Sequence, residues 1–208
     1  MHTRFKIALK QLIVYQLAWD EPIPLVLQNE WKELIIACVK SSPISIPRTI
    51  FHKNCIGRPE FIGYWDGSDQ AYDGIVYSRW KIDHTAWHTC LIAGKARVTP
   101  SSGITTPRAE LCGLVTLCRL MDSIINAMPN KPKRVTLIGD STCTIASCEA
   151  NCASLGAYFS NRVVEIIDLM DKWGTGGMIS ALEESQEEEA TIVDQLWHRR
   201  HKSCRLTH

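Results

Sequence analysis

The chain has 208 residues, enough for one ordinary domain and a smaller segment. Its 45% hydrophobic and 22% charged residues are typical of a soluble globular protein. The net charge of +1 gives no basic excess of the kind that marks a free-standing nucleic-acid binder, although a module of a longer polyprotein can have its basic surface elsewhere. No apolar run is long enough to span a bilayer, and no membrane partner is expected.

The nine cysteines are odd in number and scattered through the chain. We expect reduced thiols and an intracellular protein. Neither Cys148 with Cys152 nor the terminal group of His198, His201 and Cys204 has a complete four-ligand zinc pattern.

The first 50 residues predict a helical segment. Apolar residues at helical spacing predict one helix over residues 3–18 and a second over residues 25–40. Pro22 and Pro24 separate the two, because proline cannot continue a helix. Ser41, Ser42 and Pro43 end the second helix.

Residues 58–100 predict three strands, at 61–66, 71–82 and 87–98, which are rich in aromatic and β-branched residues. Short polar turns at 67–70 and 83–85 join them, so neighbouring strands should be antiparallel.

A long helix is then predicted from Pro107 to Met128, with Thr106 as its N-cap. A strand from residue 134 to Ile138 follows, and it should lie parallel to the first strand because a helix connects the two. A short helix beginning at Ser141 and a helix over residues 155–172 complete an α/β fold, a mixed sheet with flanking helices.

The last part of the chain, residues 174–208, has a different character. It begins with glycines, continues with an acidic run at 183–189 to which we assign no function, and includes a candidate last strand at 192–198.

Three acids occupy related positions in this order of elements. Asp66 ends the first strand, Glu110 lies at the edge of the apolar face of the long helix, and Asp140 ends the later strand. Three carboxylates brought together suit Mg²⁺, a hard ion that prefers oxygen ligands. Each acid also has a simpler interpretation: Asp66 as a turn residue, Glu110 as a first-turn acid favoured by the helix dipole, and Asp140 as an N-cap. If the register of the first strand differs from the predicted one, Asp69 or Asp73 takes the place of Asp66 as the first acid of the site.

The motifs around these acids resemble a known family. Asp-Gly-Ser at 66–68, Arg-Ala-Glu-Leu at 108–111 and Gly-Asp-Ser at 139–141 resemble the ribonuclease H pattern. Pro-Arg-Ala-Glu-Leu at 107–111, Lys-Ala-Arg-Val at 95–98 and Tyr-Phe-Ser-Asn-Arg-Val at 158–163 are similar to one branch, the Pao/BEL long-terminal-repeat retrotransposon polyprotein. The resemblance extends from near the N-terminus to about Lys172.

The resemblance implies a ribonuclease H-like domain at residues 51–173, preceded by a helical connection segment at 1–50. The segment around Trp-Asp-Glu-Pro at 19–22 resembles the stretch that joins reverse transcriptase to this domain, and it is equally consistent with a helical hairpin packed on the next domain. The implied activity is hydrolysis of the RNA strand of an RNA–DNA hybrid, with the reverse transcriptase portion of the same polyprotein as a partner. The implied location is intracellular: the cytoplasm, a virus-like particle or the nucleus.

In this interpretation Asp66, Glu110 and Asp140 are the catalytic residues and hold Mg²⁺ or Mn²⁺. Four weaker candidates stand beside them. Arg108 and Arg162 are placed to meet phosphates or to pair with an acid, and Ser68 and Ser141 to contact the substrate backbone.

The chain departs from the family pattern at its end. Family members usually have a fourth acid after the last strand, whereas residues 199–208 contain no acid and no proline. We expect this tail to reflect a truncated chain or a shifted reading frame. The alternative function is therefore a degenerate, inactive retroelement fragment that acts at most as a nucleic-acid or protein binding module. A retroviral-type aspartic protease is excluded, because Asp-Gly-Ser at 66–68 and Gly-Asp-Ser-Thr at 139–142 scramble the Asp-Thr/Ser-Gly order it needs.

Overall fold

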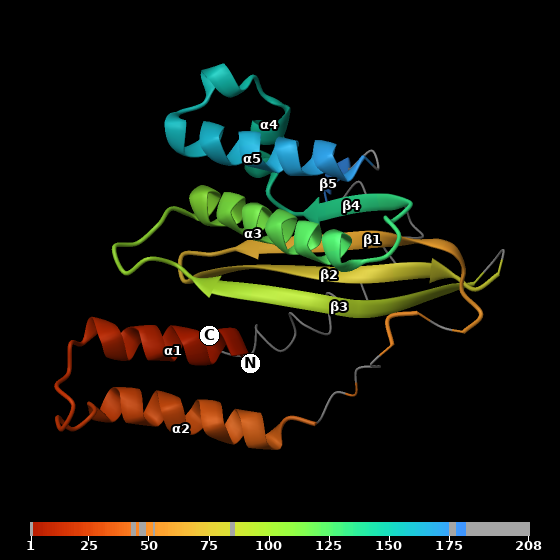
Figure 1. Ribbon diagram of the computed structural model, residues 1–208. Helices are drawn as coiled ribbons and strands as arrows, with labels where there is room; N and C mark the ends of the chain where they lie inside the picture. Colours follow the sequence, from red (N-terminus) through yellow and green to blue (C-terminus); the bar gives the residue numbers. More distant parts are fainter. Residues whose placement is uncertain are drawn as a thin grey trace.

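The computed structural model describes residues 2–42, 45, 49–51, 53–83, 86–174 and 178–181. Figure 1 shows a twisted sheet with helices on one face and a helical hairpin beside one edge. The elements are α1 (His2–Val14), α2 (Leu25–Lys40), β1 (Ile56–Gly67), β2 (Ala71–Lys81), β3 (Trp87–Val98), α3 (Thr106–Ala127), β4 (Arg134–Gly139), α4 (Thr142–Glu149), the 3₁₀ turn η1 (Cys152–Ser154), α5 (Ala157–Trp173) and β5 (Met178–Ala181).

The five strands form one mixed sheet in the order β3-β2-β1-β4-β5. Strands β1, β2 and β3 are antiparallel neighbours, and β4 and β5 continue the sheet parallel to β1. The predicted fold class is therefore confirmed, including the parallel pairing of the strand that follows the long helix.

Helix α3 covers the centre of the sheet (Figure 1). Its apolar stripe packs on alternate side chains of β1 and β2, because side chains of a strand point to opposite faces in turn. The core that results is fully or almost fully buried and consists mainly of Phe61, Trp65, Val76, Leu111, Leu114, Leu117, Met121, Val163, Ile166 and Trp173. Burial of each large apolar side chain contributes about 1.5–3 kcal/mol, so this layer fixes how α3 lies on the sheet.

The helical hairpin α1–α2 packs on the edge strand β3, as one of the sequence interpretations predicted. The Phe5 and Trp31 rings lie 5.8 Å apart and join the two helices. The Lys6 ammonium donates to the carbonyl oxygen of Ala96 (2.7 Å), which ties α1 to β3. None of the helices in the described residues has the length and hydropathy that crossing a membrane requires.

Several boundaries differ from the sequence-based expectation. Helix α1 ends at Val14 rather than at residue 18, and Gln16 just beyond it has a left-handed φ of 52°. The N-cap of α3 is Thr105 rather than Thr106, because the extended Thr105 already offers its carbonyl to the Ala109 N–H (3.0 Å). Strand β1 begins at Ile56, five residues before the predicted start.

The strand β5 was not predicted. It pairs with β4 over the four residues Met178–Ala181. The candidate last strand at residues 192–198, like the acidic run at 183–189, lies outside the described residues.

Candidate functional site

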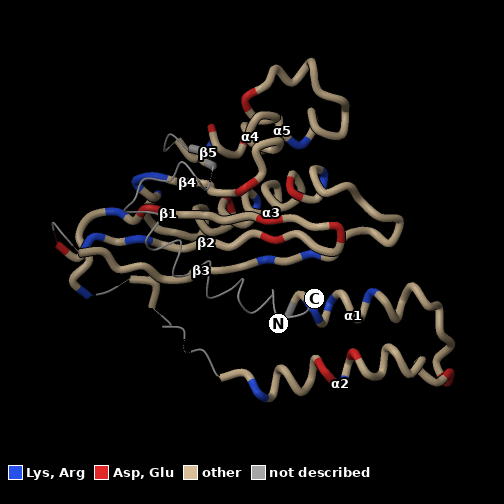
Figure 2. Tube along the Cα trace, turned by 180° about the vertical axis from the view of Figure 1, so that it is seen from behind, with Lys and Arg blue, Asp and Glu red and all other residues tan. Residues whose placement is uncertain are grey.

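The two strand-end acids lie on neighbouring parallel strands. Tyr64 of β1 is opposite Ile138 of β4, and the same register continued by two residues brings Asp66 beside Asp140. Asp66 is half-buried and its Oδ1 accepts a hydrogen bond from the Gly67 N–H (2.7 Å), whereas Asp140 is exposed. Figure 2 shows acidic positions at this end of the sheet, where β1 and β4 end and α3 begins.

Glycines bring the start of α3 directly onto the end of β1. A Cβ atom on Gly67 would lie 2.4 Å from the backbone nitrogen of Glu110, and one on Gly113 would lie 2.7 Å from the carbonyl oxygen of Asp66. Both distances are shorter than any ordinary contact, so only glycine permits this approach. The third acid, Glu110, is thereby held next to Asp66.

Ser141 connects Glu110 to the start of α4. Its hydroxyl donates to Glu110 Oε2 (2.7 Å), and its Oγ accepts from the Thr144 N–H (3.1 Å) as the N-cap of α4. The side chain is 6% exposed. Ser141 is thus placed to orient the Glu110 carboxylate from within the protein.

A fourth acid, Asp73, also lies at this edge, and the sequence analysis considered it only as a replacement for Asp66 in a different strand register. Asp73 lies in β2 directly opposite Asp66 and is half-buried. Its place in the strand is signalled by its two-residue spacing from Ile75 and Tyr77, which share its face of the sheet. By contrast, Asp69 is in the exposed turn between the strands.

The donor chemistry of this edge fits a divalent cation, because carboxylate oxygens are the ligands that Mg²⁺ and Mn²⁺ prefer. In the described part of the chain, however, no three His, Cys, Asp or Glu side chains are close enough together to hold an ion between them. The backbone brings Asp66, Glu110 and Asp140 to one edge, while their side chains are not gathered around a common point.

The weaker candidates lie around the same end of the molecule. Ser68 is exposed in the β1–β2 turn, where its hydroxyl contacts the Ala71 carbonyl oxygen (3.0 Å). The Arg108 and Arg162 guanidinium groups both lie over the Tyr158 ring, with their central carbons 4.6 Å and 3.6 Å from its centroid.

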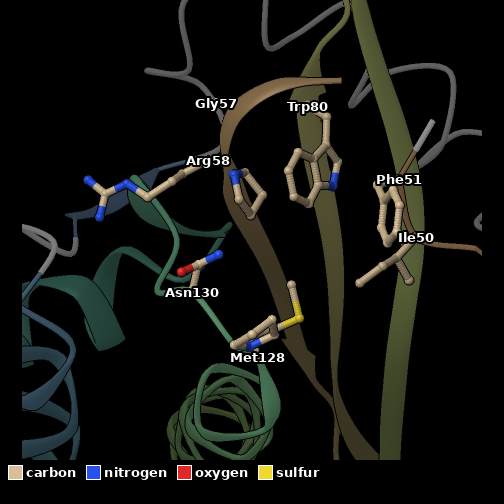
Figure 3. Close-up of a pocket in the computed structure, with 9 residues that line it drawn as sticks. Ile50, Phe51, Gly57, Arg58, Trp80, Met128 and Asn130 are labelled. Carbon is tan, nitrogen blue, oxygen red and sulfur yellow. The ribbon is translucent and has the colours of Figure 1, made fainter. Parts of the chain in front are cut away.

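A small cavity of about 160 Å³ lies at the opposite end of the sheet (Figure 3). Phe51 and Trp80, with ring centroids 6.0 Å apart, form one side of it, and Met128 forms another. None of the described residues that line it is acidic, so the cavity lacks the groups that a hydrolytic site needs.

Solved structures with a similar arrangement of elements include ribonucleases H. They include the N-terminal RNase H domain of a Mycobacterium tuberculosis protein (13% identity, TM-score 0.43, 59% of this chain and 81% of that chain). LC11-RNase H1 in complex with an RNA/DNA hybrid is also similar (11% identity, TM-score 0.41, 65% of this chain and 92% of that chain). The prototype foamy virus protease-reverse transcriptase is similar as well (13% identity, TM-score 0.39, 76% of this chain and 21% of that chain). A search of curated proteins finds no match.

The family comparison is more specific. The model of the Pao retrotransposon-like RNaseH-like domain matches residues 1–141. This range includes the hairpin, the first four strands and all three acids, and it covers more than half of the 208 residues. Together with the mixed sheet, the match establishes an RNase H-like fold. The chain belongs to the Pao retrotransposon-like RNaseH-like domain family.

Proposed function

We propose that this protein is a retroelement ribonuclease H that hydrolyses the RNA strand of RNA–DNA hybrids during reverse transcription. The supporting observation is that the backbone brings Asp66, Glu110 and Asp140 to one edge of the sheet, at the ends of β1 and β4 and in the first turns of α3. Ligands of α/β folds bind outside the carboxyl ends of parallel strands, which is where these acids lie.

In this proposal the three carboxylates hold Mg²⁺ or Mn²⁺. When bound, the ions lower the pKa of a water molecule and stabilise negative charge on the phosphoryl group. Ser141 keeps one Glu110 oxygen directed by its hydrogen bond, and the close backbone contact at Gly67 sets the spacing of Glu110 from Asp66. Ser68, exposed in the turn after Asp66, is available to the substrate backbone. The hybrid is recognised by its shape and 2′-hydroxyls rather than by base sequence.

The reverse transcriptase portion of the same polyprotein is the proposed protein partner. The α1–α2 hairpin supports this, because its helices and the turn between them expose large apolar residues, among them Trp19, Leu25, Ile36 and Val39. Apolar patches of this kind mark interaction surfaces.

The test is cleavage of a labelled RNA–DNA hybrid in Mg²⁺ or Mn²⁺ by the unaltered protein and by Asp140→Asn. Loss of a metal ligand should lower the cleavage rate on the order of 100-fold or more, since even partners behind the ligands contribute up to about that factor. Asp168→Asn makes the same change at an exposed acid of α5 and should leave the rate unaltered. Equal rates for the two variants would contradict the proposed site.

The second candidate is a binding module without turnover. It is favoured by the separation of the described acids, no three of which surround a common point. Unfolding temperature with and without Mg²⁺, measured together with hybrid binding and cleavage, distinguishes the two functions. Mg²⁺ that binds the native state must raise the unfolding temperature. Such a rise together with cleavage supports the enzyme, whereas hybrid binding without cleavage supports the binding module.

A further inference from the structure

Two arginines from different helices share one tyrosine ring at the same end of the molecule as the acids. Arg108 lies in the first turn of α3, while Tyr158 and Arg162 lie in the first two turns of α5. Arg162 Nη1 donates to the Tyr158 carbonyl oxygen (2.9 Å), and the Tyr158 hydroxyl lies 3.2 Å from Cys112 Sγ of α3. These contacts fix the ring between the two helices. We call Arg108, Tyr158 and Arg162 the arginine–tyrosine cluster.

The two positive charges of the cluster are close together and are not neutralised by a described acid. The guanidinium carbons lie 4.6 Å and 3.6 Å from the same ring centroid, so the two charges are no farther apart than about one Debye length (~8 Å at physiological ionic strength). In the described residues neither Arg108 nor Arg162 contacts a carboxylate. The contrast is with Arg119 on the same helix α3, which pairs with Glu165.

The surroundings add positive potential. Helices α3 and α5 both begin here, and neither has a side chain that caps its first backbone N–H groups. The positive ends of two helix dipoles therefore point toward the end of the molecule where the arginines lie. The Tyr158 ring holds both guanidinium groups by cation–π contact, and most of their N–H donors remain free for a ligand because Arg162 uses one and Arg108 none within the described residues.

We infer that the arginine–tyrosine cluster is a phosphate subsite, which binds a backbone phosphodiester of the nucleic acid beside the one that is cleaved. This inference rests on the proposed function. Arg108 and Glu110 both lie in the first turns of α3, so the cluster and the acids share one end of this helix, although side chains two residues apart leave a helix on different sides. A nucleic-acid strand longer than one nucleotide can therefore contact the acids with one phosphate and the cluster with a neighbouring one. A planar guanidinium can bind phosphate through two parallel hydrogen bonds, which suits a subsite that fixes the register of the strand. Tyr158 acts as a positioning residue for both arginines.

The test measures the affinity for a fluorescein-labelled RNA–DNA hybrid at several salt concentrations, without divalent ions so that no cleavage occurs. Each phosphate contact contributes about 0.7–0.9 to the slope of log affinity against log salt. Arg108→Gln and Arg162→Gln should each reduce the slope by about this amount and weaken binding at 0.1 M salt about fivefold to tenfold. Arg119→Gln is the matched control, since it removes an ion-paired charge from the same helix, and its slope should equal that of the unaltered protein.

Two further variants separate charge from packing. Arg108→Lys should restore the slope, because a lysine also contacts phosphate as a point charge. Tyr158→Phe should preserve the slope and Tyr158→Ala should lower it, with the unfolding temperature measured to show that each variant is folded. A merely structural Tyr158 would lower the unfolding temperature without changing the slope, and that result would overturn its positioning role.

The outcomes distinguish this inference from the proposed function. Equal slopes for Arg108→Gln, Arg162→Gln and Arg119→Gln, in a protein that still cleaves the hybrid, would overturn the phosphate subsite alone. Failure of the unaltered protein to bind or cleave any hybrid would overturn both.

Discussion

At the scale of single residues, Ser141 is the point where the fold and the candidate chemistry meet. The Ser141 hydroxyl donates its proton to the Glu110 carboxylate, and its oxygen accepts from the Thr144 N–H. The same oxygen lies 2.8 Å from the Thr144 hydroxyl. Loss of an N-cap costs about 1 kcal/mol, and loss of a group that orients a metal ligand costs about 10–100-fold in activity. We therefore expect Ser141→Ala to lower the free energy of unfolding slightly and the rate of hybrid cleavage strongly.

The measurement is urea unfolding beside hybrid cleavage for the same variant. Ser123→Ala serves as the control, because Ser123 lies on the exposed side of α3 and its hydroxyl only donates to the Arg119 carbonyl oxygen (2.9 Å). Its unfolding free energy should change by no more than about 0.5 kcal/mol. A Ser141→Ala protein that cleaves at the unaltered rate would show that Glu110 needs no oriented donor.

At the scale of elements, the contact between β1 and α3 places Glu110. Gly67→Ala would force a methyl group against the backbone of Ala109 and Glu110, which no side-chain rotation relieves. We expect a loss of about 1–3 kcal/mol in the free energy of unfolding, together with reduced cleavage, because the helix start must move away from Asp66. The same change at Gly94 in β3 meets its nearest neighbour, Ile75, at an ordinary 3.6 Å and should be tolerated. If Gly67→Ala and Gly94→Ala unfold at the same urea concentration, the contact is looser than the structure indicates.

The elements also show how much a sequence alone can predict. Helix α2 and strand β3 begin and end where expected, since prolines and polar turns interrupt the hydrophobic periodicity there. The three acids could be singled out as candidates because each stands at the end or start of an element, and their role as metal ligands stays a prediction. The four-residue strand β5 was missed because so short a segment has no periodicity of its own and exists through its pairing with β4.

Contacts between distant elements were less predictable. The hydrogen bond from Ser141 to Glu110 joins residues 31 positions apart, and the pairing of Asp73 with Asp66 depends on the register of a hairpin. The cluster of Arg108 and Arg162 on Tyr158 depends on how α5 packs on α3. Such relations follow from tertiary packing, which local propensity does not encode.

At the scale of the whole molecule, an ion cluster links three strands at the opposite end of the sheet from the acids. Glu60 of β1 pairs with Arg79 of β2 (2.8 Å) and with Arg134 of β4 (3.3 Å), and the side chains of Glu60 and Arg79 are almost fully buried. Burial by itself raises the pKa of Glu60, but the hydrogen bond from Arg79 and the charges of Arg134 and Arg79 outweigh it and lower the pKa below its ordinary value. Folding therefore favours the ionised form of Glu60.

This cluster predicts how the stability of the whole protein depends on pH. Because the folded-state pKa of Glu60 is depressed, its stabilising effect is complete above the unfolded-state pKa of about 4.3 and is lost as the pH falls through the lower folded-state value. Glu60→Gln should lose about 3 kcal/mol of unfolding free energy near neutral pH, since it removes the charged partner that Arg79 contacts inside the protein. The difference in unfolding free energy between the unaltered protein and Glu60→Gln, measured by urea unfolding from about pH 7 to about pH 2, should stay constant down to about pH 5 and shrink below it.

Glu165→Gln is the control. It breaks the more exposed pair with Arg119 and should cost no more than about 1 kcal/mol at any pH. A Glu60→Gln gap that persists undiminished in acid would mean that packing of the side chain, not its charge, joins the three strands.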